Sequence, residues 1–170
     1  MKRKKKISAP LVAVVIATGS LTGLAALPAQ AATPVASAPA DGVIRQGSDY
    51  TFDETIVRLK ADIAAKGIRL FDEIDHHKLG AGVNLQIGRS TLLLFGNPPL
   101  GVQFLQANPL AGLDWPVRML VTQDEDGTVW ISWTDFRFVA GRYQLSNRDA
   151  QIAMASEVAA SIASAARKQP

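Results

Sequence analysis

The sequence predicts a two-layer α+β domain, in which helices pack on a mixed or antiparallel sheet. Three observations support this fold class. They are a helix with an apolar face starting near residue 52, a strong hairpin pattern at residues 116–133, and a helix near the carboxyl end with isoleucines and alanines along one side. Helices and strands that alternate first and then end in a hairpin are typical of a sheet with helices on one face.

The clearest helix is expected over residues 51–67 (TFDETIVRLKADIAAKG). Its apolar side chains recur with helical spacing on one face, at Phe52, Ile56, Leu59 and Ile63. Thr51 and Glu54 have the spacing of a capping box, and Gly67 supplies a stop signal. Since a strand is predicted on each side of this helix, the chain is expected to open β–α–β.

Three stretches in the first half are predicted strands. Residues 43–48 and 68–75 flank the helix, and residues 89–95 (RSTLLLF) form a continuous apolar run. Such a run is typical of a central strand covered on both faces. The glycine-rich residues 76–88 are expected to form a loop with one short helical turn.

In the second half, residues 96–109 are expected to form a loop and a short helix that ends before Pro109. Residues 116–133 predict a hairpin whose turn contains Asp126 and Gly127, residue types suited to positive φ. The final helix is expected over residues 146–168, with Ser146 or Asn147 as its cap and with a stripe of Ile152, Ala155, Ala159, Ile162 and Ala166. The stripe is interpreted as a lid on the sheet, and a partner-binding face is the alternative.

The first 31 residues have the pattern of an export signal. A basic leader precedes an apolar run at residues 11–26, and small residues at 29 and 31 fit a cleavage site. The run is short for a span of roughly 20 residues, although a retained amino-terminal anchor is the alternative. Export to the periplasm or the exterior is therefore predicted, with residues 32–42 as a flexible tether and 43–170 as one domain.

Removing this leader changes the electrostatics. Five of the 18 basic residues lie in it and no acidic ones, so the remainder has 13 basic and 15 acidic side chains, a formal net charge of −2. Nucleic-acid binding needs a clustered basic surface, which the remainder lacks. The chain has no cysteine, which excludes disulfides, lipoprotein anchoring and thiol chemistry. No cofactor is implied, and the mature chain is expected to have no stable membrane span.

Three segments, taken in order, resemble the domain of unknown function family 302. They are FDEIDHH (71–77), LLLFGNPPLG (92–101) and LDWPVRMLVTQDEDGTVWISW (113–133). The resemblance covers about residues 43–145 and implies a compact α+β fold, but no activity, since the family has no agreed biochemical function. The chain departs from the usual pattern at His77, Val102 and Trp115.

Both histidines of the chain follow an acid, in Asp75-His76-His77. Neighbours on a strand point to opposite faces, so His76 and His77 would share zinc or copper only where the strand ends. Alternatively, Asp75 would orient His76 as the general base of a hydrolase or isomerase. In the structural interpretation, Asp75 caps the following turn and His76 bonds to a backbone carbonyl.

A second candidate is the turn after the apolar strand. Asn97 is expected to cap a helix with Pro98 at its first position, and free N–H groups there would attract an anion. A tight turn in which Gly96 supplies an unusual φ is the alternative. The leading hypothesis is a non-catalytic binding or interaction module, whose pocket for a small anionic molecule combines His76, Lys78, Gly96, Asn97 and Pro98. A homodimer through a sheet edge or a helix is the candidate assembly.

The three tryptophans lie on or beside the hairpin strands. Alternation places Trp130 and Trp133 on opposite faces, so at least one is expected to meet solvent, a groove or a partner. Trp115 precedes the first hairpin strand. Packing in the core or at the rim of the sheet is the alternative for all three.

Overall fold

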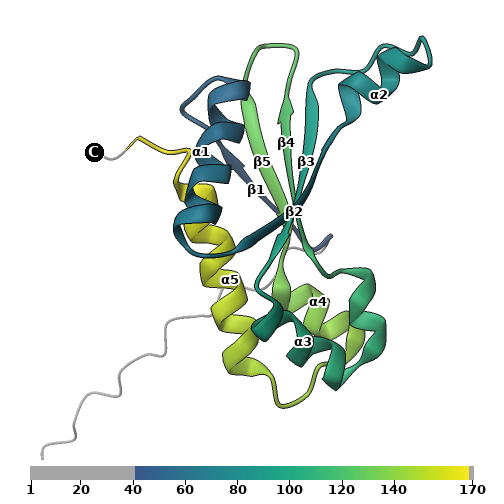
Figure 1. The fold of residues 1–170 in the computed structure, drawn as a ribbon, viewed down its shortest axis with the longest axis vertical. Helices are drawn as coiled ribbons and strands as arrows, with labels where there is room; N and C mark the ends of the chain where they lie inside the picture. Colours follow the sequence, from purple (N-terminus) through teal and green to yellow (C-terminus); the bar gives the residue numbers. More distant parts are fainter. Residues whose placement is uncertain (1–40, 169–170) are drawn as a thin grey trace, which may run out of the picture. The chain divides into compact units, whose positions relative to one another are not determined.

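The computed structural model describes residues 41–168. The predicted leader and nearly all of the predicted tether lie outside these residues, so both stay predictions. The elements, shown in Figure 1, are β1 (Val43–Gly47), α1 (Phe52–Ala65), β2 (Arg69–Asp75), α2 (His76–Gly82), β3 (Ser90–Gly96), α3 (Pro98–Ala107), the 3₁₀ helix η1 (Pro109–Leu113), β4 (Val117–Gln123), β5 (Val129–Thr134), α4 (Phe136–Tyr143) and α5 (Asp149–Ser164).

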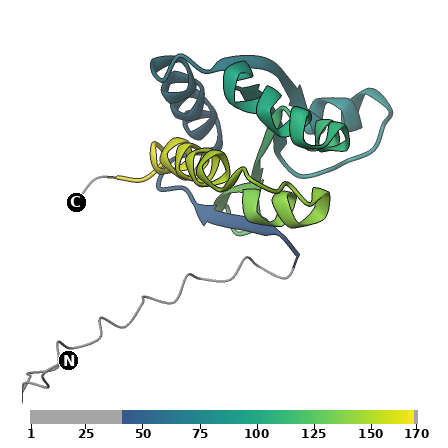
Figure 2. The same ribbon diagram turned by 90° about the horizontal axis from the view of Figure 1, so that it is seen from below.

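The strands form one sheet in the order β1-β5-β4-β3-β2, and every neighbouring pair is antiparallel. Helices α1 and α5 cover one face of this sheet (Figure 2). The core lies between these two helices and the sheet. It contains the fully buried Leu59, Ile63, Leu93, Phe95, Met119, Val121, Ile131 and Ile162. The predicted two-layer α+β fold is therefore confirmed, with an antiparallel sheet.

Helix α1 forms as its sequence pattern predicts. The Thr51 side chain accepts a hydrogen bond from the backbone N–H of Glu54, and all four apolar positions of the predicted face are buried. Gly67 ends the helical segment with φ of +65°, a conformation that glycine adopts without strain.

Helix α5 packs as predicted but begins differently. All five residues of its predicted stripe are buried, so it is a lid on its own sheet. The predicted cap at Ser146 or Asn147 is wrong, because Arg148 occupies the N-cap position and makes no side-chain cap. The Arg148 side chain instead donates to the Gln103 carbonyl at 3.1 Å, which ties the start of α5 to α3.

The prediction that the apolar strand is covered on both faces is wrong. In β3, Leu93 and Phe95 are buried under the helices, whereas Leu92 and Leu94 are only half-buried. Within residues 41–168, no helix layer lies over their face of the sheet (Figure 2). An antiparallel sheet tolerates this because one face can remain in contact with water.

Helix α4 and the short 3₁₀ helix η1 were not predicted. Helix α4 follows the hairpin, and Asp135 caps it by accepting from the N–H of Arg137 at 2.8 Å. Helix α2 is longer than the expected single turn and projects beyond the sheet, while α3, η1 and α4 gather at the opposite end (Figure 1). No helix among residues 41–168 is both long and apolar enough to cross a membrane.

Candidate functional site

The two predicted halves of the site lie at opposite ends of the sheet. Strands β2 and β3 pair antiparallel, with Asp75 opposite Thr91 and Arg69 opposite Gly96. Each strand has seven residues, so their ends are roughly 20 Å apart at about 3.3 Å per residue. The predicted pocket that joins His76 and Lys78 to Asn97 is therefore wrong. Only a parallel pair would have brought the two strand ends together.

At one end lies a polar cleft of about 140 Å³, lined by Asp53, Glu73, Asp75, His77 and Arg89 among others. Asp75 accepts from the backbone N–H of Lys78 at 2.9 Å and caps α2, as the structural interpretation predicts. His76 Nδ1 lies 3.0 Å from the Ser90 hydroxyl, and His77 Nδ1 lies 2.8 Å from the Ile87 carbonyl. The carbonyl partner predicted for His76 thus belongs to His77.

This arrangement does not produce the predicted catalytic pair. The Asp75 carboxylate bonds to backbone and His76 to a hydroxyl, so neither orients the other. The two histidines are likewise held by different partners, and residues 41–168 contain no group of three or more His, Asp or Glu side chains that could hold a metal ion. Within residues 41–168, neither an Asp75–His76 pair nor a metal-binding cluster forms at the histidines.

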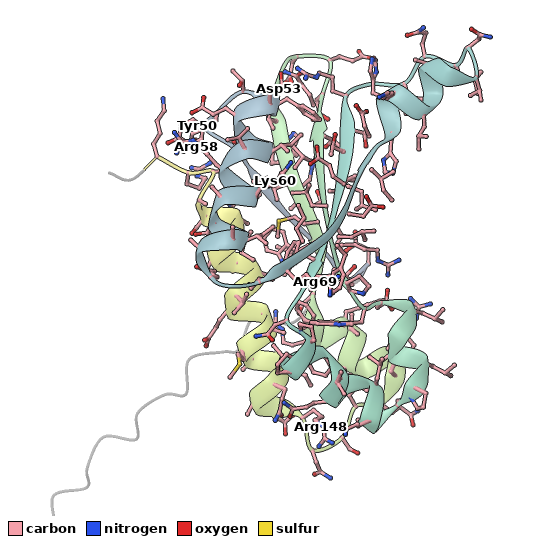
Figure 3. All side chains as sticks on the ribbon, in the orientation of Figure 1. Tyr50, Asp53, Arg58, Lys60, Arg69 and Arg148 are labelled. Atoms are coloured by element: carbon pink, nitrogen blue, oxygen red, sulfur yellow. The ribbon has the colours of Figure 1, made fainter. Side chains whose placement is uncertain are left out.

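The remaining charges of the polar cleft are also paired. Arg89 forms an ion pair with Asp53, and Lys60 of α1 forms one with Glu73 at 2.5 Å. Figure 3 shows Asp53 and Lys60 along α1, on the side from which these pairs reach the sheet. The polar cleft is therefore cross-linked by its own side chains.

The predicted anion site at the start of α3 is also wrong. Pro98 and Pro99 have no backbone N–H, and the N–H groups of Leu100 and Gly101 donate to the Asn97 carbonyl at 3.1 and 2.9 Å. Asn97 occupies the predicted N-cap position, but its side chain makes no cap hydrogen bond. From Pro98 to Gly101, the first turn of α3 therefore offers an anion no free backbone N–H donor.

Gly96, the residue before Asn97, has a different role from the predicted one. Gly96 has no positive φ, so an unusual backbone conformation is not the reason for glycine here. A Cβ at Gly96 would lie 3.0 Å from the Trp115 ring, which shows that glycine lets the indole approach the strand. Gly101 in α3 does the same, since a Cβ there would overlap the indole.

Trp115 forms one wall of an apolar pocket of about 250 Å³ at this end of the sheet. Its floor comes from Phe95, Val117 and Phe136, and its second wall comes from α5, through Met154, Ala155, Val158 and Ala159. Ala155 and Ala159, both small, line the space together with large side chains from β3, β4 and α4. We call this space the apolar pocket; Gly96 also lines it, and its polar lining side chains are Lys66 and Asn97.

The two polar side chains of the apolar pocket differ in whether they have a partner within the protein. The Asn97 side chain is exposed and makes no hydrogen bond within the described residues. Lys66 forms an ion pair with Asp62 one helical turn away at 2.5 Å. Both side chains line the apolar pocket, and the Asn97 amide has donors without an internal partner.

Beside the pocket, Asp114 connects η1, β4 and α4. Its carboxylate accepts from the Tyr143 hydroxyl at 2.6 Å and pairs with Arg118 and Arg142. The hydrogen bond to Asp114, together with burial, raises the pKa of Tyr143 above its ordinary value of 10.0. This cluster holds the backbone next to Trp115, and the indole also packs edge-on against Phe104, with centroids 5.8 Å apart.

The predicted alternation of the hairpin tryptophans is confirmed. Trp133 is buried in the core, whereas Trp130 lies half-buried on the opposite face. There its ring stacks under Arg45 at 4.0 Å and its N–H donates to Asp124 at 2.7 Å. The third tryptophan, Trp115, is half-buried at the apolar pocket, so sequence reasoning found three of the pocket's residues, namely Gly96, Asn97 and Trp115, without joining them.

Sequence reasoning missed the α5 wall, Lys66 and Phe136. The alanine stripe of α5 was visible in the sequence, but it predicts only close packing. Which large residues stand opposite the alanines depends on the tertiary fold.

Comparison with known proteins identifies relatives of two kinds. The chain is 32% identical over 112 residues to "Fluoride-specific ion channel FluC 1" of Brucella suis and to "Fluoride-specific ion channel FluC 2" of Brucella melitensis. These matches cover 66% of this chain, which spans only 44% and 42% of those proteins.

A solved structure shows the same fold. The crystal structure of an uncharacterised conserved DUF302 protein from Bacillus stearothermophilus superposes with a TM-score of 0.68 and 19% sequence identity, covering 74% of this chain and 98% of that one. The model of the family "Domain of unknown function DUF302" matches residues 44–168. The chain therefore belongs to the DUF302 family.

Proposed function

We propose that this chain is a non-catalytic binding module for a small molecule with an apolar body and one anionic group. The observation that carries the proposal is the apolar pocket, whose volume of about 250 Å³ exceeds the roughly 150 Å³ of a protein cavity that accommodates benzene. Ligand sites are typically apolar with a few directional polar groups. The apolar pocket has this composition.

A carboxylate matches the two polar lining residues of this pocket, Lys66 and Asn97. It would accept a hydrogen bond from the Asn97 amide and a charge-assisted one from Lys66, whose ammonium group has three N–H donors and gives one to Asp62. Its apolar tail or ring would displace water from Phe95 and Phe136. Burial of apolar surface stabilises such a complex by roughly 25 cal/mol per Å². The ligand class is thus a short-chain or aromatic carboxylic acid.

The polar cleft supports a binding or catalytic role less well. Its acids and Arg89 are engaged with one another, with Lys60 or with backbone groups. The Brucella relatives are named as fluoride channels, so fluoride is a reasonable second probe. We also propose that the module acts after export, on the basis of the leader pattern in residues 1–31.

Thermal unfolding in the presence of octanoate, octanol, octylamine or sodium fluoride tests the proposal. A ligand present at 100 times its Kd stabilises the folded state by about 2.7 kcal/mol. We expect octanoate to raise the Tm most, octanol to raise it less, and octylamine and fluoride to leave it unchanged. An octanoate response no larger than that of octylamine would overturn the proposal.

Two variants locate the effect. Val158→Phe fills the apolar pocket, whereas Val57→Phe places the same ring on the exposed surface of α1. We expect Val158→Phe to abolish the octanoate response and Val57→Phe to retain it. Asn97→Ala should weaken binding by roughly five- to tenfold, in line with the loss of one hydrogen bond worth about 1 kcal/mol.

A further inference from the structure

Residues 76–89, between β2 and β3, form a projection that we call the arm. It projects sideways from the sheet, on the side away from α1 (Figure 1). Four large aliphatic side chains on it are strongly exposed: Leu79 (60%), Val83 (65%), Leu85 (64%) and Ile87 (43%). Single exposed aliphatic residues are ordinary, but a group of four on one short segment is a candidate interaction surface.

The arm is held in a defined shape by its own backbone. The N–H of Leu85 donates to the Gly80 carbonyl at 2.9 Å, and His77 bonds to the Ile87 carbonyl at 2.8 Å. A Cβ at Gly80 would lie 2.8 Å from the Leu85 carbonyl, so a larger residue there would push the two limbs of the arm apart. The four aliphatic side chains are therefore preorganised, which lowers the entropic cost of binding.

The sheet provides a surface of matching chemistry. On the face opposite α1 and α5, the strand register places Ile74, Leu92 and Leu120 in one row, with Leu94 beside it. All four are only half-buried. We call them the open sheet face.

We propose that the arm of one copy of this chain docks on the open sheet face of a second copy, in a two-fold dimer. A two-fold axis makes the contact twice, so each copy covers both of its apolar surfaces. The charges are complementary as well: Lys78 lies exposed on the arm, and Asp72 lies beside Leu94 at the edge of the open sheet face. Neither side chain forms an ion pair within residues 41–168.

The outer edge of β2 is a poorer route to a dimer. The strand register shifts between Leu70 and Asp72, and such a bulge interrupts pairing with a further strand. The same strand carries Asp72, Glu73 and Asp75, which would repel their copies in a symmetric pair. We therefore favour the open sheet face over the β2 edge as the contact, while the sheet edge or helix predicted from the sequence stays a prediction.

Sedimentation velocity over a concentration series tests the dimer. We expect the purified protein to dimerise and Leu85→Asp to raise the dimer Kd by more than tenfold, because a carboxylate would be buried in an apolar contact. Leu110→Asp, at an equally exposed position on η1 (63%), is the matched control and should dimerise normally. A monomeric wild-type protein at about 200 μM, or a Leu85→Asp variant that dimerises like the wild type, would overturn the proposal.

A charge exchange tests the reciprocal geometry. Lys78→Glu places acids on both sides of each contact, and Asp72→Lys places lysines on both sides, so each variant alone should dimerise roughly tenfold more weakly. Mixed together, the two variants restore an opposite-charge pair at both contacts and should form a heterodimer. A mixture that stays as weak as its components would contradict the arrangement.

One further result would assign the arm to a different partner. If the wild-type protein stays monomeric and co-sediments with phosphatidylglycerol vesicles, and Leu85→Asp abolishes this, the arm binds membrane surfaces and the dimer proposal fails. The apolar pocket lies at the other end of the sheet, so a failure of this proposal leaves the binding function untouched.

Discussion

The two ends of the β2–β3 pair differ in how they use their side chains. At the arm end, Asp75, His76 and His77 are polar and conspicuous in the sequence, yet each is engaged by a neighbouring backbone or hydroxyl group. At the pocket end, mostly apolar and small residues leave about 250 Å³ unfilled. Reactive residue types thus serve local structure here, whereas the proposed binding site arises from packing.

The largest difference between the ends is expected from matched glycine substitutions. Gly101→Ala would force the Trp115 indole away from α3, and we expect a loss of about 2–3 kcal/mol in the free energy of unfolding. Gly82→Ala, on the arm, meets no atom within 4 Å and should stay within about 0.5 kcal/mol of the wild type. Urea denaturation measures both. Equal losses would contradict the tight packing assigned to the pocket end.

Matched aspartate substitutions at the two ends are expected to cause smaller losses in the free energy of unfolding. Asp114→Ala leaves the buried Tyr143 hydroxyl without its acceptor and should destabilise the protein by about 2 kcal/mol. Asp75→Ala removes an N-cap from the seven-residue α2 and should cost about 1 kcal/mol. Hydrogen exchange separates the two, because the second change should accelerate exchange only in the arm. Faster exchange throughout the sheet in Asp75→Ala would show that the arm end also supports the core.

The smallest effect is confined to alkaline pH. The pKa of Tyr143 is raised by its hydrogen bond to Asp114, so the folded state favours the neutral phenol. The resulting stabilisation is complete below the ordinary tyrosine pKa of about 10 and is lost as the pH rises through the raised value. The stability difference between wild type and Tyr143→Phe should therefore shrink above about pH 10. Chemical denaturation at several pH values measures it, and a constant difference would contradict the assignment.

Much of the fold was predictable because local signals agreed with the tertiary structure. The capped, one-sided pattern of residues 51–67 gave α1, the Asp126-Gly127 turn gave the β4–β5 hairpin, and the stripe of α5 gave its buried face. Helix α4 was not predicted because its eight residues are too few for a clear helical period. Coverage of β3 was overestimated, since a run of leucines does not reveal that alternate ones face an uncovered side.

The candidate site was less predictable. Asn97, Gly96 and Trp115 were each noticed, but their joint position with α5 depends on contacts between residues distant in the sequence. The error about His76 came from the direction in which β2 and β3 pair. A glycine-rich connection with one helical turn fits parallel or antiparallel strands, so the sequence did not reveal that His76 and Asn97 lie at opposite ends. The absence of a backbone anion site at the start of α3 could have been predicted from the sequence, since two consecutive prolines remove two N–H donors.

The central claim is that the pocket end, and not the histidine end, binds ligand. A titration of the ¹⁵N-labelled protein with octanoate, followed by NMR, tests it most directly. The account predicts shift changes at the Asn97 side-chain amide, the Trp115 indole N–H and the α5 amides near Val158, with none at His76 or His77. Shift changes centred on residues 75–78 and 89–91, or no changes at all, would contradict it.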